Sequence, residues 1–114
     1  MYLYQTVVLF SLDTTHLHDL MGETVNVILE WYNLGLALGL LPRTLDVIQS
    51  QNVDPITCQR TMLMEWLKRK DQVPQNGSPS WRTLVRALRS VTVNREDVAN
   101  DIAQKHKITL IDLT

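Results

Sequence analysis

The residues that could support catalysis or bind a metal are one cysteine, Cys58, and three histidines. A cysteine nucleophile needs a histidine nearby, and nothing in the sequence brings His16, His18 or His106 to Cys58. Cys58 also falls on the apolar side of a predicted helix, where a free cysteine acts as a small hydrophobic residue. His16 and His18 are two positions apart, so on a helix they point in different directions and cannot share one metal ion. We therefore expect no catalytic residue, no cofactor and no metal site.

The carboxylates and glycines form no catalytic or phosphate-binding pattern either. Glu96, Asp97 and Asp101 lie on one predicted helix, and acids near the start of a helix are explained by its dipole. Gly35 and Gly39 lie within an apolar helix, whereas a phosphate-binding loop requires glycines between a strand and a helix. The sequence therefore predicts a protein that is not an enzyme.

Basic residues are concentrated in the second half of the chain. Residues 1–57 hold one basic residue and six acids, and residues 58–114 hold ten basic residues and six acids, so charges of −5 and +4 make up the net charge of −1. Arg82, Arg86 and Arg89 share one face of a predicted helix. Such a stripe could bind phosphates, meet acidic residues of a protein partner, or simply face solvent. Because the whole chain is not basic, we favour a protein partner over nucleic acid.

Length and composition place limits on the class of protein. A chain of 114 residues fits one domain, and 45% hydrophobic with 20% charged residues is ordinary for a globular protein. No apolar run approaches the ~20 residues of a membrane-spanning helix. A signal peptide has a basic stretch before its apolar run, and the N-terminal apolar run here has none. A single cysteine cannot form an internal disulfide, which favours a reducing compartment. We expect one cytoplasmic domain with no membrane partner.

The spacing of apolar residues predicts six helices that would position these side chains. The first follows Asp13 and continues to Ile28, although Gly22 weakens it and could bend it. Residues 71–77 are predicted to be a loop. The other five helices cover approximately residues 31–38, 42–50, 55–70, 79–89 and 95–107.

Individual residues predict where these helices begin and end. Asp54-Pro55 and Ser78-Pro79 each combine an N-cap with a proline at the first helical position. Asn94 is the expected N-cap of the last helix. Gly39 should end the second helix in a left-handed conformation.

The two ends of the chain do not fit the helical pattern. Residues 2–10 and 108–111 are rich in β-branched and aromatic residues, which are typical of strands. They could pair as a two-stranded ribbon, be disordered, or belong to a larger protein. We favour an ordered extension at the N-terminus, either a strand or a helix.

A series of sequence phrases resembles the death-domain family. WYNLGLALGL is followed by Pro42 and LDVI, and then by MLMEWL, SPSWRTLVRAL and EDVANDIA. In that family a tryptophan opens the second helix, an LD-x-I phrase ends the short third helix, and phrases of the form ML-x-x-WL and W-x-x-L-x-x-AL lie in the fourth and fifth. The residues at those positions here are Trp31, Leu34, Leu38-Gly39-Leu40, Leu45-Asp46-Val47-Ile48, Met62-Leu63, Trp66-Leu67, Trp81, Leu84 and Ala87-Leu88.

The resemblance covers about residues 13–106 and implies an all-α domain, an antiparallel six-helix bundle of Greek-key type. Residues 1–12 and 107–114 would then be N-terminal and C-terminal extensions. The resemblance also implies a non-enzymatic role, because death domains bind other death domains, in copies of themselves or in adaptors. They build cytoplasmic signalling complexes of many chains, in apoptosis, inflammation or innate immunity. Members usually lie within larger proteins, so the chain is expected to be a fragment or a stand-alone variant.

On this interpretation, acids of the first three helices would meet basic residues of a neighbouring copy in a higher-order oligomer. The expected contact residues are Glu30, Asp46, Lys68, Arg69, Arg82 and Arg86. The residues expected to form the core are Trp31, Leu34, Leu45, Ile48, Trp66, Trp81, Leu84 and Leu88. Two alternatives remain open: a small helical nucleic-acid-binding domain that uses the basic stripe of the fifth helix, and a scaffold packed against other parts of a larger chain.

Overall fold

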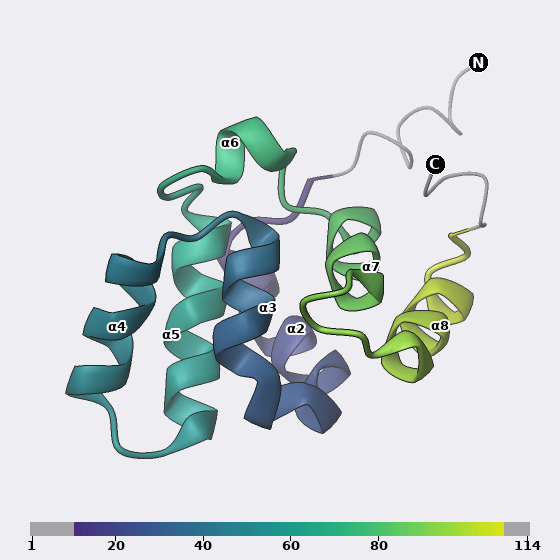
Figure 1. Ribbon diagram of the computed structural model, residues 1–114. Helices are drawn as coiled ribbons and strands as arrows, with labels where there is room; N and C mark the ends of the chain where they lie inside the picture. The colour runs from purple at the N-terminus through teal and green to yellow at the C-terminus, as the bar shows by residue number, and fades with distance from the viewer. Residues whose placement is uncertain (1–10, 109–114) are drawn as a thin grey trace.

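A computed structural model describes residues 11–108 (Figure 1). These residues form seven α-helices and two 3-10 segments, with no strand among them, so the predicted all-α class is confirmed. The predicted terminal ribbon lies outside the described residues, apart from Ile108. The elements are η1 (Thr14–His16), α2 (Leu17–Glu23), η2 (Val25–Glu30), α3 (Trp31–Leu38), α4 (Pro42–Gln51), α5 (Pro55–Leu67), α6 (Val73–Asn76), α7 (Trp81–Arg89) and α8 (Glu96–Lys105).

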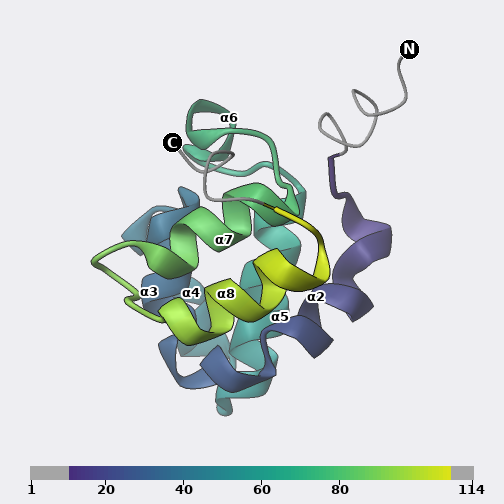
Figure 2. The ribbon, with the colours of Figure 1, turned by 90° about the vertical axis from the view of Figure 1, so that its right-hand side faces the viewer.

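The helices pack in two groups around one core. Helices α3, α4 and α5 lie side by side, with α6 at one end (Figure 1). Helix α7 packs against α3 and carries α8 on its other side, and α2 packs against α5 (Figure 2). Because every α-helix contributes at least one buried apolar side chain to the same cluster, the described residues form one folding unit.

The predicted first helix is interrupted at Thr24. Thr24 (φ −110°) separates α2 from η2, and the backbone leaves the helical conformation again at Val27 (φ −120°), inside η2. Thr24 is fully buried, and both its carbonyl and its hydroxyl accept a hydrogen bond from Gln59 Nε2, each at 2.9 Å. The prediction of one continuous helix is therefore wrong. The break lies beside a tertiary hydrogen bond from α5, whereas the expected weak point, Gly22, lies inside α2.

Two glycines allow α3 to pack closely against its neighbours. Helix α3 ends at Gly39, as predicted, with a φ of +109°, and the N–H of Leu40 bonds to the carbonyl of Gly35 at 3.0 Å. Gly35 is buried where α3 meets α4 and α5. A Cβ there would lie 2.7 Å from Leu45 Cδ2 and 3.1 Å from Met62 Cγ. Neither position has room for a larger residue without movement of a neighbour.

Residues 71–77 are not a loop throughout, because α6 forms one helical turn within them. The backbone N–H of Gln72 donates to the carbonyl of Gly39, and Asn76 Nδ2 donates to the carbonyl of Ala37, each at 3.0 Å. The last carbonyls of a helix lack partners within it. Helix α6 therefore supplies donors to the C-terminal end of α3, a tertiary role that turn-forming residues in the sequence do not reveal.

The helix starts follow the predictions in part. Asp54 caps α5 as predicted, and its carboxylate accepts a backbone N–H at 2.7 Å. Ser80 caps α7 in place of Ser78, with its hydroxyl accepting the N–H three residues on at 3.0 Å. Asn94 does not cap α8: its backbone is left-handed (φ 54°), and Arg95 occupies the N-cap position.

The predicted core is confirmed with one exception. Trp31, Trp66 and the five predicted aliphatic residues are buried. Trp81, the first residue of α7, is only half-buried, and its ring stacks on that of His106. Leu12, which belongs to the predicted N-terminal extension, is fully buried and packs in the core.

Candidate interaction surfaces

Three of the four predicted contact cations are unpaired. Lys68, at the end of α5, and Arg86, on α7, are exposed, and Arg82 is half-buried on α7. None of the three side chains has a hydrogen-bond or ion-pair partner among residues 11–108. The fourth, Arg69, is exposed with a left-handed backbone (φ 61°), and its Nη1 donates to the carbonyl of Leu67 at 3.2 Å. All four keep their charge available to a partner.

The predicted basic stripe on α7 is shorter than the sequence indicates. Arg89 Nη2 lies 3.8 Å from the carboxylate of Glu96, and Arg89 Nη1 donates to Asn100 Oδ1 at 3.1 Å. Both partners belong to α8, so Arg89 joins the two helices. Arg82 and Arg86 are the stripe residues that remain unpaired.

The predicted acid Glu30 is engaged within the molecule. Its Oε1 lies 3.3 Å from Arg95 Nη1, which also donates to the carbonyl of Asn26 at 3.0 Å. The hydrogen bond from Arg95 to Asp97 is the main reason that the pKa of the guanidinium is raised. This network joins η2 to the start of α8, so Glu30 would have to leave a structural contact in order to bind a partner.

The predicted acid Asp46 is likewise engaged. It accepts a hydrogen bond from the hydroxyl of Tyr32 at 2.6 Å, which raises the pKa of that phenol. Tyr32 belongs to α3 and Asp46 to α4. This acid therefore joins two helices, although it lies at an exposed position.

Two other acids are better placed to meet a partner. Asp19 on α2 and Asp101 on α8 are exposed and have no hydrogen-bond or ion-pair partner within the described part of the chain. The sequence could have indicated Asp19, because no lysine or arginine lies three or four positions from it on its helix. It would have paired Asp101 with Lys105, four residues on, but Lys105 Nζ lies 3.3 Å from Glu23 instead.

Basic residues also gather at one end of the molecule. Arg43, Lys68, Arg69 and Lys70, which we call the basic end, lie where α4 begins and α5 ends, next to α6 (Figure 1). Lys70 forms a loose ion pair of 3.7 Å with Glu65. The other three side chains form no ion pair with the residues described.

The basic end is held together by one carboxylate, that of Asp71. Its Oδ2 accepts hydrogen bonds from the N–H of Leu41 at 2.9 Å and the hydroxyl of Thr44 at 2.6 Å, so it caps α4 from the chain that follows α5. Burial acts to raise the pKa of Asp71. The two hydrogen bonds, with the charges of Lys70 and Arg43, outweigh burial and hold that pKa below its usual value.

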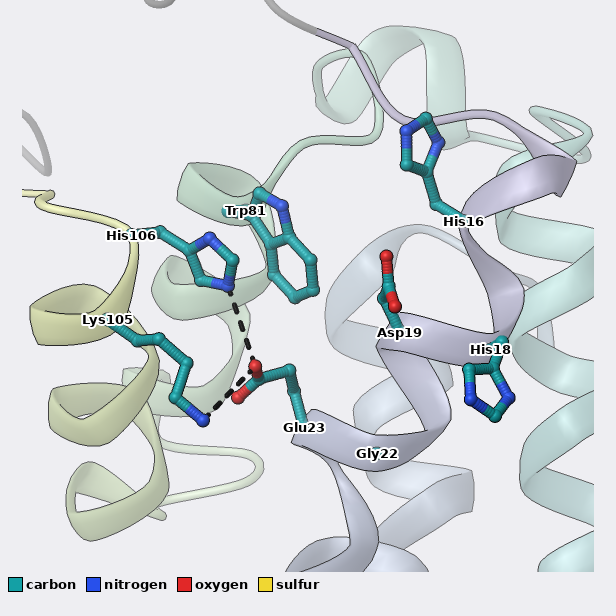
Figure 3. Close-up of a pocket in the computed structure, with 8 residues that line it drawn as sticks. All are labelled: His16, His18, Asp19, Gly22, Glu23, Trp81, Lys105 and His106. Atoms are coloured by element: carbon teal, nitrogen blue, oxygen red, sulfur yellow. Dashed lines mark ion pairs between the residues drawn. The ribbon is translucent and has the colours of Figure 1, made fainter.

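A groove of about 560 Å³ separates α2 from the α7–α8 pair (Figure 3). Glu23 Oε2 bridges it, lying 3.3 Å from Lys105 Nζ and 3.7 Å from His106 Nε2. The imidazole of His106 stacks on Trp81 with 3.9 Å between ring centroids and 12° between planes. Glu23 therefore joins the two walls of the groove, and the aromatic stack joins α7 to the end of α8 within one wall.

All three histidines line this groove, which the sequence did not predict. His16 and His18 nevertheless point to different sides of α2 (Figure 3). Within residues 11–108, no three His, Cys, Asp or Glu side chains are placed to hold a metal ion. Cys58 lies elsewhere, in the core, where burial and then the charge of Asp54 raise the pKa of its thiol.

No protein-family model matches this sequence, and no curated protein or solved structure matches it. In the part of the chain that the structure describes, no helix is long and apolar enough to cross a membrane. The features of the molecule that bear on its function are therefore the sequence phrases, the helical fold and the distribution of unpaired charges.

Proposed function

We propose that the chain is a non-enzymatic interaction module of death-domain type, which binds its own copies or related domains to assemble cytoplasmic signalling complexes. The observation that carries the proposal is the location of the family-like phrases. They fall in order on α3, α4, α5, α7 and α8, and the tryptophan of each of the first, third and fourth packs in or beside one common core. Apoptosis and innate immunity are the pathways this resemblance implies.

The helix count supports the same proposal. If η1, α2 and η2 are taken together as one broken first helix, and the single turn α6 is set aside, the described residues contain six helical units. We propose that these six correspond to the Greek-key bundle of the family. The resemblance concerns the fold first, and function inferred from a fold is an analogy, so it needs a direct test.

The proposed contact joins the basic residues of one copy to acids of the next. Lys68, Arg82 and Arg86 are unpaired cations, and Asp19 and Asp101 are unpaired acids that supplement Glu30 and Asp46. An exposed ion pair contributes only ~0–1 kcal/mol, so several pairs would have to form together. Because such pairs are screened by salt, assembly should weaken as the ionic strength rises. A contact between two different surfaces does not close on itself and can extend to many copies.

Light scattering across a salt series tests the proposal. The wild-type chain should self-associate at low salt and become monomeric at high salt, and Arg86→Glu should prevent association without lowering the melting temperature. Arg60→Glu is the matched control: Arg60 is also exposed and unpaired, but lies on α5 outside the proposed contact. Equal loss of association in both variants would mean that net charge, not this contact, is responsible. A strictly monomeric wild type at high concentration and low salt would refute self-assembly.

A pull-down addresses the version of the proposal in which the partner is a related adaptor. The wild-type chain should retain a partner that the Arg86→Glu chain does not. A partner retained equally by both would exclude the α7 cations from the contact. A nucleic-acid-binding function has less support, because two arginines of the stripe are unpaired rather than three. Titration of a DNA duplex tests it: salt-dependent binding at low micromolar protein would favour it.

A further inference from the structure

Asn76 and Gly77, at the end of α6, are the only asparagine–glycine pair in the sequence. Both residues are exposed. Gly77 has a φ of 107° and a ψ of 148°, a conformation that residues with a side chain rarely adopt. Its backbone N–H forms no hydrogen bond with the residues that the structure describes. The pair thus places an unbonded backbone nitrogen next to a side-chain amide, in a helix of only one turn.

We infer that Asn76 deamidates spontaneously through attack by the backbone of Gly77, and that the product weakens the docking of α6 on α3. The nitrogen of Gly77 forms a bond to Asn76 Cγ and gives up its proton. The bond from Cγ to Nδ2 breaks, and the nitrogen leaves as ammonia, which closes a succinimide ring. Water then opens the ring at one of its two carbonyls and leaves aspartate or isoaspartate at position 76. Water is the only co-reactant that the reaction needs, and ammonia is the only group released.

The local structure makes Asn76 the preferred site of this reaction. The side chain of the following residue crowds the attacking nitrogen, and glycine has none. A Cβ placed on Gly77 would meet only Thr83 Oγ1, at 3.8 Å, so the surrounding residues leave the Cα of Gly77 open. The other asparagines precede residues with larger side chains; they are Asn26, Asn33, Asn52, Asn94 and Asn100.

The reaction removes one of two hydrogen bonds between α6 and the end of α3. Asn76 Nδ2 donates to the carbonyl of Ala37 at 3.0 Å, and the second bond runs from Gln72 to Gly39. A carboxylate at position 76 cannot donate a hydrogen bond, and it brings a negative charge to the negative end of the α3 dipole. Helix α6 should therefore detach more often. This inference does not depend on the proposed function.

Mass spectrometry of the full chain, aged in mildly alkaline buffer, tests the first half of the inference. The tryptic peptide 71–82 should gain the mass difference between an amide and an acid, and contain isoaspartate, before any other asparagine reacts. Because the hydrogen bond to Ala37 must break first, the folded chain should react roughly fivefold more slowly than the chain in urea, the equivalent of ~1 kcal/mol. Gly77→Ala should suppress the reaction in urea. Conversion in urea with none in the folded chain, or equal conversion of all asparagines, would overturn the site; equal rates in both states would overturn the protective contact.

Hydrogen exchange tests the second half, with Asn76→Asp as the reaction product. The Gln72 N–H, which bonds to Gly39, should exchange roughly fivefold faster than in the wild type, again the equivalent of ~1 kcal/mol. Asn33→Asp is the matched control, because Asn33 is exposed on α3 and has no hydrogen-bond partner among the described residues. The aged wild-type chain, separated by charge, provides the same readout without a substitution. Unchanged exchange of Gln72 in both Asn76→Asp and the aged chain would overturn the proposed effect on docking.

Discussion

The same substitution, glycine to alanine, should have opposite effects on stability at Gly39 and Gly22. In the unfolded chain each substitution removes a similar amount of backbone entropy, worth ~0.4–1 kcal/mol in favour of folding. The difference between the two variants therefore reports on the folded state. Gly22 lies within α2, and a Cβ there meets nothing within 4 Å. Alanine is also the better helix former, so Gly22→Ala should stabilise the protein by about 0.5–1 kcal/mol.

At Gly39 the folded state resists the same change for two reasons. Its φ of +109° is one that alanine adopts at a cost of roughly 1–2 kcal/mol. A Cβ would also lie 3.1 Å from backbone atoms of Gln72 and Val73, which cannot rotate away as a side chain can. Relief of that contact requires a shift of α6, and overpacking of this kind costs about 1–3 kcal/mol. After the gain through the unfolded state is subtracted, Gly39→Ala should destabilise by roughly 1–4.5 kcal/mol, a range centred near 3 kcal/mol.

Urea unfolding measures the free energy of unfolding of both variants, and thermal melting measures their melting temperatures, each followed by circular dichroism. For a domain of this size a change of 1 kcal/mol moves the melting temperature by roughly 4 °C, so Gly39→Ala should melt about 10 °C lower and Gly22→Ala a few degrees higher than the wild type. Hydrogen exchange at the Gln72 N–H should quicken in Gly39→Ala alone, because that amide bonds to Gly39. Wild-type stability of Gly39→Ala would refute both the left-handed helix end and the close approach of α6.

Three further substitutions test the polar and aromatic contacts of the fold. Gln59→Leu removes two buried hydrogen bonds to Thr24. The Thr24 carbonyl would still accept a hydrogen bond from the N–H of Val27. The free energy of unfolding, measured in urea, should therefore fall by only about 1 kcal/mol. Asp71→Asn should lower stability at neutral pH by about 1 kcal/mol, as loss of a cap does. Because the folded pKa of Asp71 lies below 3.8, that difference should persist above pH 3.8 and disappear as the pH falls through the folded pKa. Melting curves recorded across this pH range measure it. Trp66→Ala should cost ~3–5 kcal/mol and Trp81→Ala clearly less in the same assay, because Trp66 is fully buried and Trp81 is not.

The parts of the fold that could be predicted from the sequence are those set by local chemistry. The start of α5 at Asp54-Pro55 and the end of α3 at Gly39 follow from side chains and backbone preferences within a few residues. The buried faces of α3, α5 and α7 follow from apolar spacing. The break at Thr24 and the turn α6 could not be predicted in this way, because each depends on hydrogen bonds between residues more than thirty positions apart.

The charged contact surface could likewise be predicted only in part. The sign of each charge is evident from the sequence, so Lys68, Arg82 and Arg86 could be named in advance as cations for a contact surface. It does not give the partner that the fold brings to each charge. Glu30 meets Arg95, which lies 65 residues away. Asp101 would be expected to pair with Lys105, but the approach of α2 gives Lys105 to Glu23 instead. The acids that remain for a partner therefore had to be identified from the structure.

Internal pairing does not remove the asymmetry between the two halves of the chain. Two ion pairs, Glu23–Lys105 and Glu30–Arg95, join the halves and use one charge from each. Among residues 11–57, the side chains without a lysine, arginine or carboxylate ion-pair partner are Arg43, Asp13, Asp19, Asp46 and Asp54. Among residues 58–108 they are Arg60, Lys68, Arg69, Arg82, Arg86, Lys107, Asp71 and Asp101. The unpaired charge is thus still negative in the first group and positive in the second, so two copies attract each other where acids of the first group face basic residues of the second.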